Sequence, residues 1–250
     1  MTIRIIVIVF IILILASYIT RSVLRAKEYF SAIDNDNPET VVVLHGISKT
    51  NAITYLLAKR IAAAGFEVYN ITYPSTKYTI NDLVDILNDK LLELNIDKKR
   101  KLNFVGHSMG GLLIRGYLNK YKPANLHRVV MIGTPNHGSE LANYFKNWWI
   151  FKKKFGVAGE QLGIDQKGLD GLFGPVYYNL GIIAGKTSSN PIFSSIIVGE
   201  DDGLVSVEST KLEGMNDHIV LNFSHTMGLF YRDVANEVIE YLKTGSFTNQ

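Results

Sequence analysis

The stretch Leu102-Asn103-Phe104-Val105-Gly106-His107-Ser108-Met109-Gly110-Gly111-Leu112 joins an apolar run to a helix-like segment through a Gly-x-Ser-x-Gly turn. The run 102–105 is typical of a buried strand, and the segment 112–121 has the pattern of a helix. A serine on such a strand-to-helix turn has its hydroxyl exposed above the edge of a sheet, where a base can reach it. The context therefore indicates that Ser108 is a nucleophile.

An acidic turn in the C-terminal third supplies a carboxylate after the serine, as this type of site requires. The β-branched run 196–198 is predicted to end a strand, and Glu200, Asp201 and Asp202 follow it. Three adjacent carboxylates cannot all face one histidine, so we expect two of them to be solvated. Asp202 is favoured as the acid because the Asp-Gly turn leaves it closest to the end of the strand.

A histidine follows the last predicted strand, 219–223, at the start of a helix predicted over 227–242. This position at the edge of the sheet is suited to a base. His225 would take the proton from Ser108 and later protonate the leaving group, while the carboxylate would fix its tautomer.

The remaining part of such a site is an oxyanion hole, formed by two backbone N–H groups. Met109, directly after the serine, supplies the first. The buried-strand run 41–47 ends in His-Gly-Ile, so Ile47, or less favourably Gly46, supplies the second.

Four motifs together resemble the α/β-hydrolase superfamily, and within it the small bacterial triacylglycerol lipases and esterases. They are Val42-Val43-Leu44-His45-Gly46-Ile47, Val105-Gly106-His107-Ser108-Met109-Gly110-Gly111, Asp202-Gly203-Leu204-Val205 and Ser224-His225-Thr226-Met227-Gly228-Leu229. The resemblance covers residues 40 to 243. Carried over by position, it implies a nucleophile, acid and base at Ser108, Asp202 and His225, and oxyanion donors at Ile47 and Met109.

The arrangement of the predicted elements agrees with one catalytic domain of the α/β class. The chain has 250 residues, of which 47% are hydrophobic, and β-rich runs such as 67–71 alternate with helical stretches. This alternation predicts a mostly parallel sheet with helices on both faces. Helices are predicted over 52–64, 80–94, 112–121 and 227–242. An Asn-Asp-Asn-Pro stretch marks a linker over 25–38 and places the catalytic domain at 39–250.

A long connection separates the predicted strands 128–132 and 192–198. It holds about 60 residues, far more than the usual few, and we expect a cap-like insertion over 139–190. Its segment 147–155 mixes aromatic and basic residues. Such a mixture suits a lipid interface, but the aromatic residues would equally form the core of the cap itself. The segment alone favours neither, but a membrane anchor at the N-terminus would hold the domain close to a bilayer, so we expect the cap to meet the membrane.

The N-terminus is apolar from Ile5 to Ala16 and uncharged up to Thr20. About 16 residues are short for a membrane span, which needs ~20, although Arg4 and Arg21 are placed to reach the interfaces. An uncleaved single-pass anchor over 1–24 is the favoured interpretation. The alternatives are a cleaved signal for export to the periplasm or secretion, and a buried core element. The flanking charges do not fix the orientation of an anchor.

Composition excludes several classes of partner. The formal net charge is +3 and the basic runs 98–101 and 152–154 lack a nucleic-acid motif, so no nucleic-acid partner is expected. There is no cysteine, which excludes thiol catalysis and disulfides. No metal-binding spacing or cofactor motif is present, so we expect neither a metal nor a cofactor. Nothing indicates the oligomeric state.

These observations predict a membrane-anchored or exported serine hydrolase that cleaves carboxylic esters through an acyl-enzyme, with a lipid or acyl-ester substrate. Acyl transfer or amide cleavage by the same triad is an alternative. A catalytically idle hydrolase fold that serves as a membrane-attached binding module is another. His45 and His107 are interpreted as structural members of their motifs.

Overall fold

The computed structural model describes residues 27–33, 38–96, 100–165, 169, 171–188 and 190–248. The predicted anchor over 1–24 lies outside these residues, as does part of the predicted linker over 25–38. In the part that is described, no helix has the length and apolar character needed to cross a membrane.

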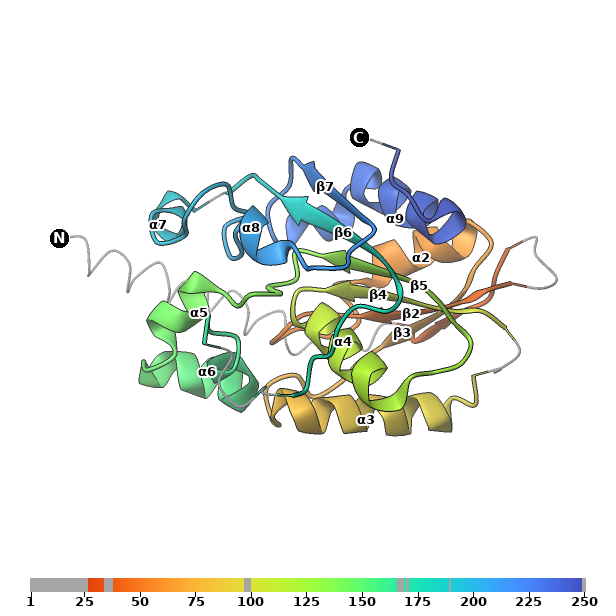
Figure 1. Ribbon diagram of the computed structural model, residues 1–250, viewed down its shortest axis with the longest axis horizontal. Coiled ribbons are helices and arrows are strands. Elements are labelled where there is room, and N and C mark those ends of the chain that lie inside the picture. The colour runs from red at the N-terminus through yellow and green to blue at the C-terminus, as the bar shows by residue number, and fades with distance from the viewer. Residues whose placement is uncertain are drawn as a thin grey trace.

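Seven strands form one sheet in the order β1-β3-β2-β4-β5-β6-β7 (Figure 1). Their bounds are β1 Tyr29–Phe30, β2 Thr40–Leu44, β3 Glu67–Ile71, β4 Leu102–His107, β5 Leu126–Ile132, β6 Asn179–Gly185 and β7 Asp217–Leu221. All neighbours pair in parallel except β1, which pairs antiparallel with β3 at the edge of the sheet. The predicted α/β class is confirmed.

Helices cover both faces of this sheet, as predicted. On one face lie α3 (Ile80–Glu93) and α4 (Met109–Tyr121), and on the other lie α2 (Tyr55–Ala63) and α9 (Arg232–Thr244) (Figure 1). Successive side chains of a strand point to opposite faces. Along β2, Val42 and Leu44 therefore pack into the core under α3 and α4, whereas Val41 and Val43 pack into the core under α2 and α9.

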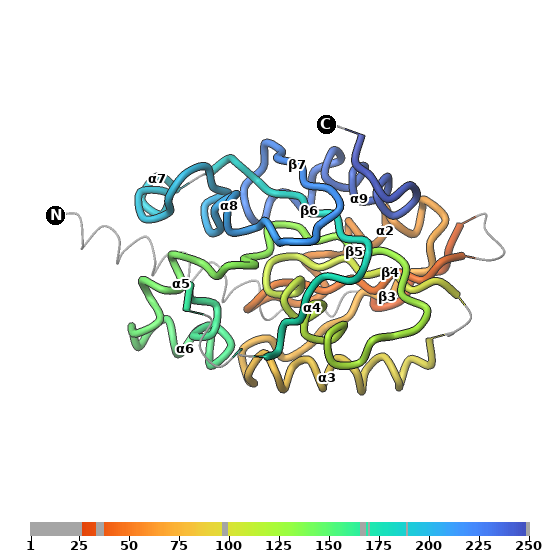
Figure 2. The backbone as a smooth tube through the Cα atoms, viewed as in Figure 1, coloured from red at the N-terminus to blue at the C-terminus, as the bar shows by residue number. Residues whose placement is uncertain are grey.

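Two helices after β5 form a cap beyond the carboxyl ends of the strands, namely α5 (Glu140–Phe145) and α6 (Trp149–Glu160) (Figures 1 and 2). The side chain of Ser139 caps α5 by accepting a hydrogen bond from the N–H of Ala142 at 3.3 Å. Phe145 and Phe151 are buried and belong to the same core as α3 and α4. The cap is therefore packed onto the domain through apolar side chains.

One predicted strand is wrong. The segment 192–198 is not a strand, because α7 (Pro191–Ser194) occupies its first half, with Asn190 capping the helix and proline in its first turn. The strand lies earlier, at β6, inside the predicted insertion 139–190. Its glycines weaken the strand pattern in the sequence. A Cβ on Gly181 would lie 2.5 Å from the Tyr241 ring, so only glycine permits this packing.

The remaining short elements surround the carboxyl edge of the sheet. They are α8 (Val207–Thr210) and the 3-10 helix η1 (Met227–Phe230). The helix predicted over 227–242 is thus broken, since Tyr231 is extended, with φ −75° and ψ 141°, before α9 begins. This break separates the histidine loop from the terminal helix.

Candidate active site

Ser108 lies on the sharp turn between β4 and α4. Its backbone has φ 55° and ψ −128°, and its N–H donates a hydrogen bond to the carbonyl of Ile132 at 2.9 Å. A positive φ is uncommon for a residue other than glycine, asparagine or aspartate and costs about 1–3 kcal/mol. The fold therefore holds this serine in a strained position at the carboxyl edge of the sheet.

Glycines around Ser108 allow the backbone to approach closely. A Cβ on Gly106 would lie 2.6 Å from the nitrogen of Gly111, and a Cβ on Gly110 would lie 2.7 Å from the carbonyl oxygen of Leu44. Both contacts are closer than real Cβ atoms allow. The two flanking glycines of the motif are thus required by packing, which supports the interpretation of the sequence.

Asp202 and His225 form a buried pair. His225 Nδ1 donates to Asp202 Oδ2 at 2.7 Å, and the backbone N–H of His225 donates to the carbonyl of Asp202 at 2.8 Å. The other carboxylate oxygen, Oδ1, accepts from the N–H groups of Leu204 and Val205 at 3.0 and 2.9 Å. Only 1% of the Asp202 surface and 7% of the His225 surface is exposed. Three N–H groups therefore donate hydrogen bonds to this carboxylate and fix its orientation toward His225.

The other two carboxylates of the acidic turn have different surroundings. Glu200 is exposed, as predicted, whereas Asp201 is buried, so the prediction that two of the three are solvated is wrong for Asp201. Asp201 Oδ1 accepts from Ser194 Oγ at 2.8 Å and from the N–H of Gly203 at 2.7 Å. Its carboxylate thus stabilises the turn that presents Asp202.

His107, the residue before the serine, supports the loop of His225. Its Nε2 donates to the carbonyl oxygen of His225 at 2.8 Å, and the two ring centroids are 4.8 Å apart. Burial and the neighbouring imidazole of His225 lower the pKa of His107 well below its usual value. A neutral imidazole here acts as a structural link between two loops, which agrees with the interpretation from the sequence.

His45 has a comparable structural position in the loop after β2. Its Nδ1 donates to the carbonyl of Gly46 at 2.8 Å, its Nε2 accepts from the N–H of Tyr73 at 3.3 Å, and its ring stacks on Tyr73 with centroids 4.2 Å apart. Burial lowers the pKa of His45 to about 4. The neutral ring fixes the loop that carries Ile47.

The two predicted oxyanion donors belong to segments next to Ser108. Met109 is the first residue of α4, so its N–H has no partner within the helix. Ile47 lines the same cavity as Ser108, in the loop after β2. Gly46 lies close to the serine, since a Cβ on it would be 2.9 Å from Ser108 Cβ. The loop therefore approaches the serine closely enough for backbone groups to reach a bound acyl oxygen.

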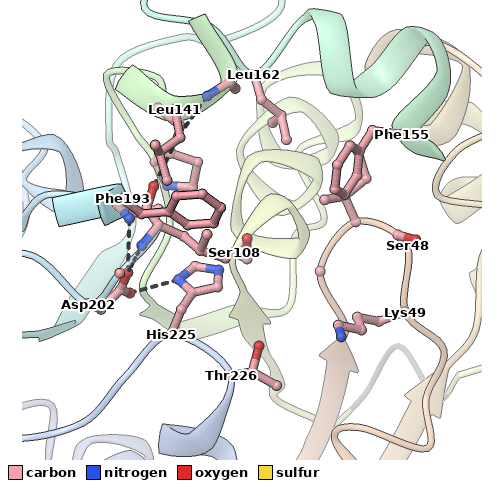
Figure 3. Close-up of a pocket in the computed structure, with 18 of the residues that line it drawn as sticks. Ser48, Lys49, Ser108, Leu141, Phe155, Leu162, Phe193, Asp202, His225 and Thr226 are labelled. Carbon is pink, nitrogen blue, oxygen red and sulfur yellow. Dashed lines mark hydrogen bonds and ion pairs between the residues drawn. The ribbon is translucent and has the colours of Figure 1, made fainter. Parts of the chain in front are cut away.

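A cavity of about 370 Å³ opens at Ser108 and His225, within the size range of ligand pockets, ~300–1,000 Å³. Apolar side chains from α5, α6, the loop after α6, and α7 form one part of it: Leu141, Ala142, Phe145, Phe151, Phe155, Leu162 and Phe193. Another part is polar, formed by Ser48, Lys49, Ser224 and Thr226. In Figure 3, Ser108 and the His225 ring point toward one another between Leu141 and Phe193 on one side and Lys49 and Thr226 on the other.

The structure thus brings together all five residues that the sequence singled out: Ser108, Asp202, His225, Ile47 and Met109. Sequence reasoning missed the polar part of the cavity. Lys49 carried no recognisable signal, since it lies outside the His-Gly motif and a lone lysine in a loop is ordinarily solvated.

Comparison with known proteins identifies relatives among thioesterases, esterases and lipases. Residues 40–167 match the family described as palmitoyl protein thioesterase. "Putative esterase/lipase 3" of Mycoplasma pneumoniae is 28% identical over 140 residues, which are 54% of this chain and 50% of that protein. The match therefore spans about half the length of this curated relative.

Solved structures share the fold at low sequence identity. A Bacillus licheniformis lipase in its mature form has a TM-score of 0.71 at 18% identity, and the match covers 87% of this chain and 97% of the lipase chain. Phospholipase PlaB of Legionella pneumophila has a TM-score of 0.66 at 17% identity, and the match covers 84% of this chain and 60% of the phospholipase chain. These likenesses establish the α/β-hydrolase fold. Since the family match extends over just over half of the sequence, the chain belongs to the palmitoyl protein thioesterase family of α/β-hydrolases.

Proposed function

We propose that this protein is a serine hydrolase that cleaves acyl esters or thioesters through an acyl-enzyme on Ser108. The observation that carries the proposal is the buried Asp202–His225 pair, whose ring faces a serine held with a positive φ at the mouth of an apolar cavity. A catalytically idle fold that served only for binding would not require these residue types together.

The reaction follows from the roles of these groups. Ser108 Oγ attacks the acyl carbon while His225 Nε2 takes its proton, and Asp202 stabilises the imidazolium through Nδ1. The oxyanion accepts from the N–H groups of Met109 and Ile47. His225 then protonates the leaving alcohol or thiol, which departs. Water attacks the acyl-enzyme by the same steps, releasing the carboxylic acid and restoring the serine.

Two kinds of leaving group are consistent with this site. The name of the family favours a thioester, whereas the names of the solved relatives favour oxygen esters. The apolar part of the cavity is suited to an acyl chain in either case. Acyl transfer and amide cleavage by the same triad remain alternatives, since they differ only in which nucleophile or leaving group occupies the site.

The test measures the rates at which wild type, Ser108→Ala and His225→Ala hydrolyse acyl esters and acyl thioesters of graded chain length. We expect hydrolysis by wild type and a loss on the order of 10⁴-fold or more in each variant. The double variant should be little worse than either single variant, because the groups act as a unit. Near-normal turnover by a folded Ser108→Ala protein would rule out the mechanism.

We also propose that the cap meets a lipid surface, held close to it by an N-terminal anchor. Trp149 is 70% exposed at the start of α6, and the exposed Lys152 and Lys153 follow one turn later. Residues three and four apart lie on one side of a helix. Indole rings lie among lipid headgroups and lysines attract anionic phosphates, so this side of α6 is suited to an anionic membrane.

A further inference from the structure

We propose that Lys49 binds an anionic group on the leaving-group side of the substrate, so that the preferred substrates are acyl esters whose alcohol carries a phosphate or a carboxylate. This inference rests on the proposed function of Ser108. It concerns the polar part of the cavity, which the proposed chemistry itself does not use.

The position of Lys49 is the first observation. It follows Ile47 and Ser48 in the loop after β2 and lines the same cavity as Ser108 and His225. Ser48 has φ 57°, and its N–H donates to Ser75 Oγ at 3.0 Å. This hydrogen bond fixes the loop at Ser48, directly before Lys49. Figure 3 shows Lys49 across the cavity from Leu141 and Phe193, with Ser108 between them.

The absence of a partner is the second observation. Among the described residues no hydrogen bond, ion pair or ring contact involves the Lys49 ammonium, although the side chain is partly buried. Burial lowers the pKa of Lys49, with no neighbouring carboxylate to oppose the effect. A partly buried cation without a counter-ion is costly, and a bound anion would remove that cost.

The charge balance of the cavity points in the same direction. Asp202 is the one carboxylate among the residues that line the cavity, and both of its oxygens already accept hydrogen bonds. The other lining lysine, Lys154, lies over the ring of Phe155 at 5.1 Å, on the cap. Lys49 is therefore the cation placed to bind an incoming anion.

The division of the cavity assigns the two ends of the substrate. The acyl chain is suited to the apolar part below the cap, where Phe145, Phe151 and Phe193 are buried. With the acyl carbon at Ser108, the leaving group extends toward Lys49 and Thr226. A hydroxyl and an ammonium on that side are donors that match phosphate or carboxylate oxygens.

The experiment compares hexanoyl esters of glycerol, glycerol 3-phosphate and glyceric acid, which share the acyl chain and the ester carbon. The quantity measured is the ratio of kcat/KM for each anionic ester to that for the neutral ester, so any loss common to all substrates cancels. For Lys49→Met we expect the ratio for at least one of the two anionic esters to fall about tenfold or more, mainly because KM for that ester rises. Lys49→Arg should retain most of the ratio.

Lys59→Met is the matched control, because Lys59 is exposed on α2, outside the lining of the cavity, and its loss changes the net charge equally. Its ratios should equal those of wild type. A fall confined to the phosphate ester identifies phosphate as the ligand, and equal falls identify an anion of either kind. In wild type, the ratios should also decrease as ionic strength rises.

Three results would overturn the inference: wild type prefers the neutral ester, Lys49→Met leaves every ratio unchanged, or Lys59→Met lowers the ratios equally. The measurements on wild type and Lys49→Arg remain informative if Lys49→Met fails to fold. A failure of the proposed function is distinct, because then no ester would be hydrolysed in a manner that depends on Ser108.

Discussion

His107 Nε2 donates a hydrogen bond to the carbonyl oxygen of His225 at 2.8 Å, so the residue before the nucleophile holds the loop of the base. The nucleophile turn and the histidine loop are 118 residues apart in sequence. This contact fixes their relative position, although His107 also lines the cavity at Ser108. It gives a structural reason for a histidine at the variable position of the Gly-x-Ser-x-Gly motif.

Loss of this contact should reduce turnover without removing the chemistry. For His107→Ala we expect kcat to fall about 10- to 100-fold, because a small displacement of the base costs that much. His107→Gln, whose amide N–H can donate to the same carbonyl, should recover part of the loss. Steady-state kinetics with circular dichroism as the folding control would measure this. Wild-type kcat in folded His107→Ala would contradict the role.

The two neighbouring aspartates should respond differently. Asp202→Asn is expected to depress turnover by roughly 10⁴-fold, because the amide cannot support the tautomer and the imidazolium of His225. Asp201→Asn retains an oxygen that can accept from Ser194 and Gly203, so its turnover should change only a few-fold. Comparison of kcat for the two variants is the measurement. If Asp201→Asn were inactive and Asp202→Asn active, Asp201 and not Asp202 would be the acid that supports His225.

A methyl group at Gly46 should interfere with the nucleophile. Its Cβ would lie 2.9 Å from Ser108 Cβ and 3.2 Å from His107 Nδ1, so Gly46→Ala is expected to lower kcat by about 100-fold. Gly199→Ala is the control, since its φ of 86° strains the backbone while no atom lies within 4 Å of the added carbon. That variant should lose about 1 kcal/mol of stability and keep its activity. Equal activity of both variants would show that Gly46 is not constrained by the serine.

Acid should destabilise the fold through His45. Its pKa is about 4 in the folded protein and ~6.5 in the unfolded chain. Between these values the unfolded state binds more protons, so the free energy of unfolding decreases as pH falls from about 6.5 toward 4. The full effect is about 3 kcal/mol for this residue. Urea unfolding of wild type and His45→Gln across this range should give a shallower dependence for the variant, and identical dependences would exclude His45 as a source.

The two tryptophans of the cap separate packing from membrane contact. Trp148 packs edge-on against Phe145 with centroids 4.9 Å apart, whereas Trp149 is 70% exposed. Trp149→Ala should therefore lower activity on anionic vesicles and leave hydrolysis of a soluble short-chain ester unchanged. Trp148→Ala should lower the thermal stability instead. Equal loss on both substrates in Trp149→Ala would mean that this side of α6 does not bind lipid.

Local patterns were sufficient to predict most of the fold. The strand at Glu67–Ile71 has the predicted bounds, and the strand-turn-helix around Ser108 is as expected, since apolar runs and turn glycines are local signals. The strand β6 was missed because Gly181 and Gly185 lower its β propensity. Glycine is required at these positions by tertiary packing, since a Cβ on Gly185 would lie 2.6 Å from the carbonyl oxygen of Phe223.

The candidate site was predictable to the extent that its motifs carry chemistry. The order of Ser108, Asp202 and His225 and the two loops of backbone donors follow from the sequence and the resemblance. The burial of Asp201 was not predictable, because it depends on a contact with Ser194 in a helix that the sequence did not reveal. The exposure of Trp149 beside the packed Trp148 likewise depends on how the cap lies on the domain.

The most direct test of Ser108 as the nucleophile is to label the full-length protein with a fluorophosphonate and map the adduct by peptide mass spectrometry. A nucleophilic serine activated by His225 forms a stable covalent phosphonyl ester. We predict a single adduct on the peptide that contains Ser108, and its absence in Ser108→Ala and in His225→Ala. Labelling at another serine, or unchanged labelling in folded His225→Ala, would contradict this mechanism.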